Sequence, residues 1–230
     1  KLQDLLLYYS SKEEKLITLA EYLEKMPEEQ KEIYFASGET REKIATLPQV
    51  ELVKDKGYDV LYLTDNVDEF CFQMMRDYKE KPFKSVAQGD LDIESEEEKK
   101  ELEKTNEENK DLLTAIKDAL GDKVVDVKVS SRLKSHPVCL VSSEGLSFEM
   151  EKVLNQMPEG NDIKAGRILE INPNHDIFNA MKKVYEKNKD KIGDYASILY
   201  DQALLIEGFS IENPVEFSNK ICDLMIELNK

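Results

Sequence analysis

One stretch in the middle of the chain is too polar to belong to a folded core. Residues 90–111 contain eleven acidic and four basic side chains, and their strongly apolar residues are limited to Leu91, Ile93 and Leu102. Regular apolar patterns stand on both sides of this stretch, so each side must build a core of its own. We interpret the stretch as a linker or a solvated helix, and we expect a domain boundary near residue 90.

The first ninety residues alternate between helical and extended patterns. Thr18 and Glu21 have the spacing of a capping box, in which each side chain satisfies a free backbone N–H group of the other residue. Asp65 and Asn66 are expected to cap a later helix. The expected elements are a helix after Thr18, a strand at 31–36, helices across 39–56, a strand at 58–63, a helix at 67–78 and a strand at 83–87. This order favours a small parallel sheet with helices packed on it, a three-layer α/β subdomain.

Residues 112–230 carry strands first and helices last. The segment 124–129 (VVDVKV) alternates apolar and polar residues, as a half-buried strand does. The expected elements are a helix over 112–120, strands at 124–129, 137–141 and 167–171, and helices at 146–157, 175–187, 192–207 and from Asn213-Pro214 onward. This order indicates an α+β domain that ends in a helical bundle, so the fold class of the whole chain is α+β. The expected division is 1–90, 91–111 and 112–230.

The charge balance excludes some classes of partner. The chain has 32 basic and 48 acidic residues and a net charge of −16, which repels nucleic acid and anionic membranes. No apolar run approaches the roughly 18 residues that a membrane-spanning helix needs. The widely spaced Cys71, Cys139 and Cys222 are expected to be reduced thiols. We therefore expect neither nucleic acid nor a membrane as a partner.

Few residues suit catalysis or metal binding. None of the nine glycines falls in a phosphate-binding pattern. His136 is three residues from Cys139, but an intervening strand would place the two side chains on opposite faces. His175 is expected at a helix N-terminus, with Asn174 or Asp176 near the cap. We therefore predict no catalytic residue and no metal site.

One alternative is a stand-alone α/β ligand-binding protein or enzyme. Ligands of such sheets bind at the carboxyl ends of the strands. Ser37, Gly38, Asp65 and Asn66 fall at those ends, so a site near Asp65 would use them. A small molecule bound there would favour this alternative.

Four segments resemble one protein family and stand in that family's order. They are 58–65 (YDVLYLTD), 131–141 (SRLKSHPVCLV), 167–175 (RILEINPNH) and 199–209 (LYDQALLIEGF). Each resembles a motif of the 90-kDa heat-shock-protein chaperone family, most closely of its bacterial form. The resemblance covers nearly the whole chain. It implies the end of the family's middle domain followed by its C-terminal dimerisation domain.

The resemblance implies a homodimer that forms through the last two helices. Each of these helices carries an apolar stripe, and a four-helix bundle across a two-fold axis would bury both stripes. Packing of the stripes inside one domain is the alternative. The expected interface residues are Leu199, Ala203, Leu204, Ile206, Phe217, Ile221, Leu224, Met225 and Leu228.

The resemblance also implies contact with unfolded or partly folded client proteins. The helix at 146–157 carries methionines, whose flexible side chains suit surfaces that accept many partners. We expect this helix to be amphipathic, partly exposed and weakly tethered, with ordinary core packing as the alternative. The expected client-binding residues are Glu69, Phe70, Gln73, Met74, Leu146, Met150, Val153, Leu154 and Met157.

In this family ATP is bound by an N-terminal domain, and an arginine of the middle domain contributes to hydrolysis. The resemblance places both upstream of this chain, which starts with Lys1 instead of Met. Arg41 lies in a different segment from that arginine. We therefore expect a fragment that is not an enzyme and has no cofactor, with ATP and magnesium belonging to the full-length parent. The last residues lack the EEVD and KDEL endings of other family members, which favours a bacterial cytoplasmic protein.

Overall fold

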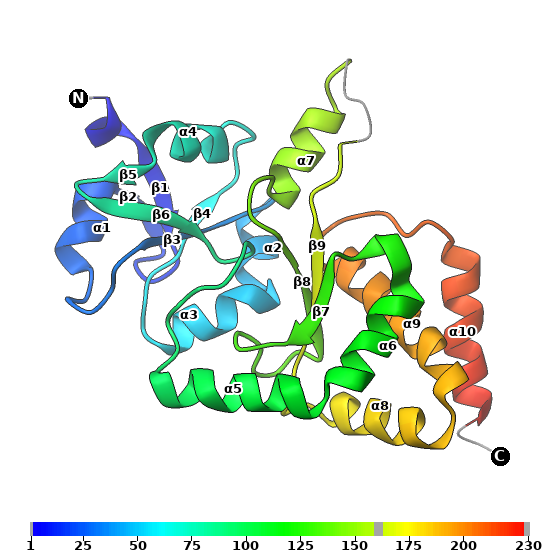
Figure 1. Ribbon diagram of the computed structural model, residues 1–230. Coiled ribbons are helices and arrows are strands. Elements are labelled where there is room, and N and C mark those ends of the chain that lie inside the picture. Colours follow the sequence, from blue (N-terminus) through cyan, green and yellow to red (C-terminus); the bar gives the residue numbers. More distant parts are fainter. Residues whose placement is uncertain (1, 159–162, 228–230) are drawn as a thin grey trace. The chain divides into compact units, whose positions relative to one another are not determined.

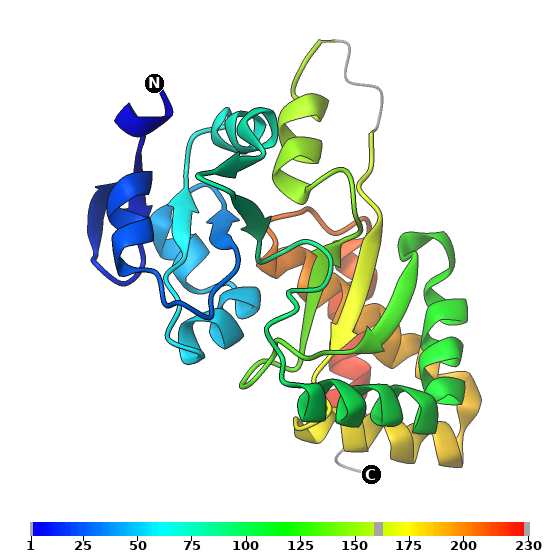
Figure 2. The same ribbon diagram turned by 60° about the vertical axis from the view of Figure 1, so that its left-hand side comes forward.

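The computed structural model describes residues 2–158 and 163–227. They form two compact units (Figure 1 and Figure 2). Unit 1 comprises Lys1–Ile93 and Ser142–Gly166, and unit 2 comprises Glu94–Val141 and Arg167–Lys230. Both units contain helices and a sheet, which confirms the mixed α+β class.

The boundary between the units falls at Ile93, close to the predicted boundary near residue 90. The observed grouping differs from the expected division in one respect, because 142–166 groups with unit 1 and not with the rest of 112–230. The polar stretch forms helix α5 (Glu96–Glu108), in which no residue is buried. A capping box starts it, since Ser95 Oγ accepts a hydrogen bond from the Glu98 N–H at 3.2 Å. Most of the polar stretch is thus a helix without buried residues.

In the described part of unit 1, six short strands form one mixed sheet. They are β1 (Leu7–Ser10), β2 (Lys15–Thr18), β3 (Ile33–Ser37), β4 (Leu61–Leu63), β5 (Asp77–Tyr78) and β6 (Lys81–Ser85). Their order across the sheet is β2-β1-β4-β3-β6-β5, and β3 runs parallel to β4 and β6. The three predicted strands are thus its parallel centre. The β1–β2 hairpin, which pairs antiparallel with β4, was not predicted.

Helices cover both faces of this sheet. Those of unit 1 are η1 (Gln3–Leu5), α1 (Leu19–Lys25), α2 (Arg41–Ala45), η2 (Pro48–Val50), α3 (Glu51–Asp55), α4 (Asp68–Met75) and α7 (Phe148–Asn155). Alternate residues of β3 enter different cores. Phe35 lies against Phe72 of α4, with ring centroids 5.1 Å apart, whereas Tyr34 shares a core with Ile44 of α2 and Val53 of α3. The helices α1 and α4 therefore cover one face, and α2 and α3 cover the other.

One of the two capping predictions for unit 1 is confirmed and the other is wrong. At the start of α1, Thr18 Oγ1 accepts from the Glu21 N–H at 3.2 Å, and Glu21 Oε2 accepts from the Thr18 N–H at 2.8 Å. The expected capping by Asp65 or Asn66 does not occur, because α4 follows Val67 and no side chain caps its first turn.

The helix α4 is also shorter than the predicted helix over 67–78. It ends at Met75 because Arg76 adopts a φ of 64°, which takes the backbone out of the helix. The chain then forms β5 and returns as β6 through the two-residue turn Lys79–Glu80. These two residues have φ values of 49° and 66°, as a type I′ hairpin turn requires.

In the described part of unit 2, three strands form a sheet with helices around it. The strands β7 (Asp126–Val129), β8 (Val138–Ser142) and β9 (Arg167–Ile171) have the order β7-β9-β8. Besides α5, the helices are α6 (Lys110–Leu120), η3 (Gly121–Lys123), α8 (Asp176–Lys187), η4 (Lys189–Lys191), α9 (Ile192–Ile206) and α10 (Pro214–Glu227). The predicted strand at 167–171 has the bounds of β9.

Single side chains join or start several elements of unit 2. Asn106 Oδ1 of α5 accepts from the Val129 N–H of β7 at 2.9 Å. His175 is the N-cap of α8, and its Nδ1 accepts from the Ile177 N–H at 3.1 Å, which confirms its predicted place at a helix N-terminus.

Within residues 2–158 and 163–227, no cluster of His, Cys, Asp and Glu could hold a metal ion. No helix in those residues is long and apolar enough to cross a membrane.

Candidate functional site

The predicted client-binding residues lie on two neighbouring helices of unit 1. Although α4 and α7 are far apart in the sequence, they lie side by side (Figure 1 and Figure 2). Gln73 of α4 donates a hydrogen bond from Nε2 to Met150 Sδ of α7 at 2.8 Å. The fold therefore gathers the two predicted segments into one region.

Glu69 connects three segments of this region. Its Oε1 accepts from the Ser37 hydroxyl at 2.7 Å at the end of β3, and its Oε2 accepts from the hydroxyl of Ser147, the N-cap of α7. Ser147 Oγ in turn accepts from the Met150 N–H at 3.1 Å. Glu69 is only 8% exposed, and this burial raises the pKa of its carboxyl although the two serine hydrogen bonds oppose the shift. We refer to Ser37, Glu69 and Ser147 as the Glu69 cluster.

The outer face of α4 is an apolar ridge. Val67, Phe70, Cys71 and Met74 have the i, i+3, i+4, i+7 spacing that places residues on one helix face. Met74 is 85% exposed, Val67 is also exposed, and Phe70 and Cys71 are half-buried. These four residues form what we call the α4 ridge.

The helix α7 adds further apolar side chains. Val153 and Leu154 are half-buried, and Met157, just beyond the helix, is exposed. Ile163 is exposed as well, and Asn155 holds it by accepting from its N–H at 3.0 Å and donating to its carbonyl at 2.8 Å. The helix is thus amphipathic and partly exposed, and shorter than the predicted 146–157.

Most of the predicted client-binding residues reach the surface of unit 1, but Glu69 and Met150 do not. Each is 8% exposed, so each positions α7 and does not face solvent. Sequence reasoning missed Val67 and Ser147, and it assigned Ser37 only to the alternative ligand site. The helical spacing of the α4 ridge could have revealed Val67, whereas the two serines become relevant only once the fold is known. Client contact by these residues stays a prediction.

The residues of the alternative ligand site surround a small pocket. Ser37, Gly38, Asp65 and Asn66 line a space of about 80 Å³ at the ends of β3 and β4, together with residues of α7 such as Lys152. Pockets that bind small molecules usually measure about 300–1,000 Å³. The size of this pocket therefore does not favour the alternative.

The predicted dimer-interface residues on α9 are mostly buried within unit 2. Leu199, Ala203 and Leu204 are buried, whereas Ile206 is exposed near the end of the helix. Leu205, which was not predicted, is exposed beside it. Only the end of α9 therefore presents apolar side chains to solvent.

The helix α10 carries two apolar stripes. Its predicted residues Phe217, Ile221 and Leu224 are half-buried, and the predicted Leu228 lies outside the described residues. A second stripe is exposed and includes the predicted Met225, which is 60% exposed. This stripe, the α10 stripe, consists of Val215, Cys222, Met225 and Ile226. The sequence could have revealed the α10 stripe, because its residues follow the same helical spacing as the predicted ones on a neighbouring face of the helix.

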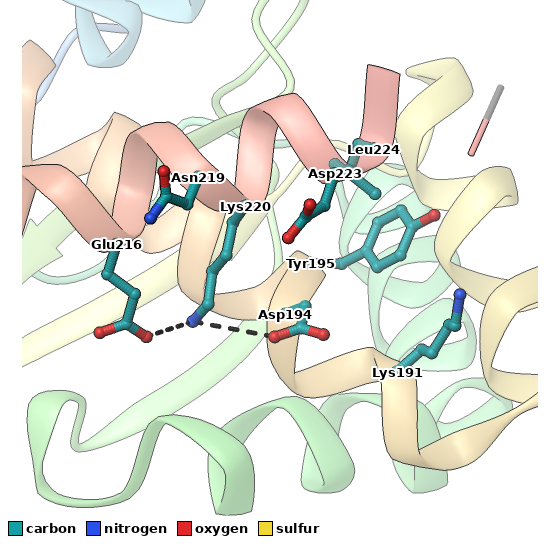
Figure 3. Close-up of a pocket in the computed structure, with 8 residues that line it drawn as sticks. All are labelled: Lys191, Asp194, Tyr195, Glu216, Asn219, Lys220, Asp223 and Leu224. Atoms are coloured by element: carbon teal, nitrogen blue, oxygen red, sulfur yellow. Dashed lines mark ion pairs between the residues drawn. The ribbon is translucent and has the colours of Figure 1, made fainter. Parts of the chain in front are cut away.

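A polar pocket of about 300 Å³ lies between α9 and α10 (Figure 3). Lys220 of α10 reaches across it. The Lys220 Nζ is 2.9 Å from Glu216 Oε1, 3.2 Å from Ser197 Oγ and 3.8 Å from Asp194 Oδ1 of α9. The hydrogen bond with Lys220 lowers the pKa of Glu216. The Glu216–Lys220 pair lies within α10, so Lys220 links α10 to α9 only through Ser197 and the 3.8 Å pair with the exposed Asp194.

Exposed apolar stripes on a strongly charged surface are typical of proteins that act by binding other proteins. The α4 ridge and the α10 stripe are exposed apolar stripes of this kind. The family model described as Hsp90 protein matches residues 1–229, so the chain belongs to the Hsp90 family, as its motifs indicated.

The chain is similar to part of several bacterial chaperones. It is 56% identical over 225 residues to the chaperone protein HtpG of Clostridium perfringens (strain 13 / Type A). It is 57% identical over 224 residues to HtpG of Clostridium botulinum (strain Langeland) and 51% identical over 226 residues to HtpG of Bacillus subtilis (strain 168). These alignments cover 97–98% of this chain and 36% of each relative. The chain therefore spans little more than a third of the length of these relatives.

Proposed function

We propose that this chain is the part of an HSP90-type chaperone that pairs two subunits and contacts unfolded or partly folded client proteins. The observation that carries the proposal is the exposed apolar surface on each unit, the α4 ridge with α7 in unit 1 and the α10 stripe in unit 2. Membership of the Hsp90 family and similarity to HtpG chaperones support it. ATP binding and hydrolysis would belong to the part of the parent protein that precedes this chain.

Pairing through α9 and α10 would bury side chains that one copy leaves exposed. The α10 stripe and the exposed Leu205 and Ile206 of α9 are apolar. Removing apolar surface from water is favourable by roughly 25 cal/mol per Å². A two-fold axis beside α10 would bring the same stripes of two copies together, which is the arrangement of a symmetric helical bundle.

Replacing Met225 with Asp should convert the proposed dimer into monomers, because it places an unpaired charge in an apolar interface. Met225 is a better position than Leu224, because a charge at the half-buried Leu224 would also disturb its own copy. Met225→Leu is the matched control, since it changes the same exposed side chain without adding a charge. Light scattering should show dimers for the parent chain and the control. A parent chain that is monomeric at high micromolar concentration would contradict the proposal.

Client contact would use the α4 ridge and the exposed side of α7. The exposed Met74 and Met157 have flexible, polarisable side chains that adapt to different apolar partners. The chain around them has a net charge of −16. This charge favours clients whose exposed apolar segments also carry lysine or arginine.

Replacing Met74 and Met157 together with Gln should weaken binding of an unfolded client about tenfold, since it removes apolar contact area from both helices. The probe is a short fluorescein-labelled peptide that mixes Leu and Phe with Ser and Lys, followed by fluorescence anisotropy. Val125→Gln is the matched control, because Val125 of unit 2 is 51% exposed and Met157 is 50% exposed. The melting temperature should stay the same in both variants. Unchanged peptide affinity in the double variant would sink the proposed client surface.

A further inference from the structure

We propose that Glu69 is a positioning residue for client binding, which fixes α7 on unit 1 through Ser147 and Ser37 and does not itself touch the client. This inference rests on the proposed role of α4 and α7 in client contact. It concerns how that surface is assembled.

Both oxygens of the Glu69 carboxylate are engaged inside unit 1. Oε1 accepts from Ser37 and Oε2 accepts from Ser147, and the residue is 8% exposed. The Ser147 hydroxyl donates to Glu69 while its oxygen accepts from the Met150 N–H. One carboxylate therefore orients the N-cap of α7 and, through it, the first turn of the helix. No carboxylate oxygen is left facing the surface on which a client would lie.

Polar contacts make up much of the attachment of α7 to the rest of unit 1. The two large cores of unit 1 are built from residues of Lys1–Ile93, and α7 contributes Phe148 and Met150 as its own buried apolar side chains. The Gln73 amide donates to the Met150 sulfur, which is a weak acceptor. The pocket of about 80 Å³ beside the ends of β3 and β4 leaves part of α7 without close packing. The charge-assisted hydrogen bonds of the Glu69 cluster hold the first turn of the helix, while Gln88 Nε2 holds the preceding loop by donating to the carbonyls of Ser143 and Gly145.

The position of α7 decides which side chains a client would meet. When α7 is docked, Met150 is buried and Val153 and Leu154 are half-buried beside α4. Loss of the Glu69 cluster would let the first turn of α7 move and would separate its apolar side chains from the α4 ridge. A substitution at Glu69 should therefore weaken client binding through the placement of α7.

Hydrogen exchange of the 230-residue chain tests this inference directly. Glu69→Ala should speed exchange of the α7 amides, 148–155, by about 10- to 100-fold, which corresponds to the loss of a hydrogen bond to a charged group. Affinity for the fluorescein-labelled peptide should fall in parallel. The amides of β3 and β4 serve as an internal control for folding, and their exchange should stay slow.

A pair of substitutions tests the geometry of the Glu69 cluster. Ser147→Asp keeps an N-cap acceptor for the Met150 N–H but places a second carboxylate against Glu69, so α7 should again exchange faster. Adding Glu69→Gln should reverse this effect. In the double variant the Gln amide can donate to the new carboxylate, while its carbonyl oxygen accepts from Ser37. A merely structural loss at either position would not be repaired by the second change.

The outcomes separate this inference from the proposed function. Weaker peptide binding by Glu69→Ala with unchanged α7 exchange would mean that Glu69 contacts the client, and the inference would be overturned while the client proposal stands. A double variant whose α7 exchanges as fast as that of Ser147→Asp alone would also overturn it. Unchanged peptide affinity in the variant at Met74 and Met157, with the expected α7 exchange in the Glu69 variants, would instead remove the client proposal.

Discussion

Glu170 places a carboxylate inside unit 2, where it is 1% exposed. Arg132, also 1% exposed, donates from Nε to Glu170 Oε2 at 3.0 Å, and the Ser130 hydroxyl donates to the same oxygen at 2.7 Å. The Lys128 Nζ lies 3.6 Å from Oε1. Buried carboxylates are tolerated when they are paired and hydrogen-bonded. Glu170 therefore depends most on Arg132 and Ser130, which are buried beside it.

Replacing Arg132 with Met should destabilise unit 2 by about 3–5 kcal/mol, because it leaves Glu170 buried without its main partner. Lys128→Met is the control, and it should cost less than about 1 kcal/mol since Lys128 is partly exposed. Urea unfolding followed by circular dichroism measures both. Adding Glu170→Gln to Arg132→Met should recover part of the loss. Equal effects of the two single changes would contradict this account of the pair.

At the scale of residues, the sequence predicts local contacts and misses distant ones. The capping box of Thr18 and Glu21 could be predicted because both partners lie within one helical turn. The burial of Glu69 could not, because its partner Ser147 is 78 positions away and meets it only in the folded unit. Because its burial was not predicted, Glu69 was expected among the client-binding residues.

The turn between β5 and β6 should be open to stabilisation. Lys79 and Glu80 hold positive φ values that side chains other than Gly and Asn adopt at a cost. Replacing them with Asn and Gly should raise the stability of unit 1 by about 1 kcal/mol, seen as a higher melting temperature. Glu24→Gly in α1 is the control, and it should lower stability by about 1 kcal/mol because glycine disfavours an ordinary helical position. A loss of stability in the turn variant would contradict the type I′ assignment.

Elements with a clear internal pattern could be predicted, whereas two reversals of the chain could not. The strand at 167–171 contains three branched or aliphatic residues, Ile168, Leu169 and Ile171, and was predicted with its observed bounds. The β1–β2 hairpin was missed because its turn has no Gly, Pro, Asn or Asp, and Glu14 there adopts a φ of 54°. The end of α4 was misplaced because Arg76 leaves the helix at positive φ, a conformation that the following hairpin imposes.

The chain as a whole should not hydrolyse ATP. None of its nine glycines lies in a phosphate-binding pattern, and we place the ATPase site in the preceding part of the parent. A steady-state assay with magnesium should give turnover no higher than buffer, with the full-length parent as the positive control. Turnover that persists after a second purification and scales with protein concentration would overturn this placement.

The overall division into two units was partly predictable. The excess of acidic residues after position 90 marks where the first chain segment of unit 1 ends, because such a stretch cannot enter a core. The return of 142–166 to unit 1 has no such marker, since the polar, Gly-containing residues at both ends of this segment predict loops and do not indicate which unit the chain enters. Contacts such as that of Glu69 with Ser147 create this part of the unit, and they follow from the fold alone.

The position of α5 has a consequence for aggregation. The strand β7 is outermost in the order β7-β9-β8, and the free side of an outer strand can template the addition of a foreign strand and so start a fibril. Asn106 of α5 accepts a hydrogen bond from the Val129 N–H of β7, and the glutamates of the same helix are exposed to solvent. Under the proposed function, extended segments of client proteins are the foreign strands that could add to this edge. The acidic helix α5 covers part of the free edge of β7 and so hinders such strand addition, while the α4 ridge and the α10 stripe stay exposed.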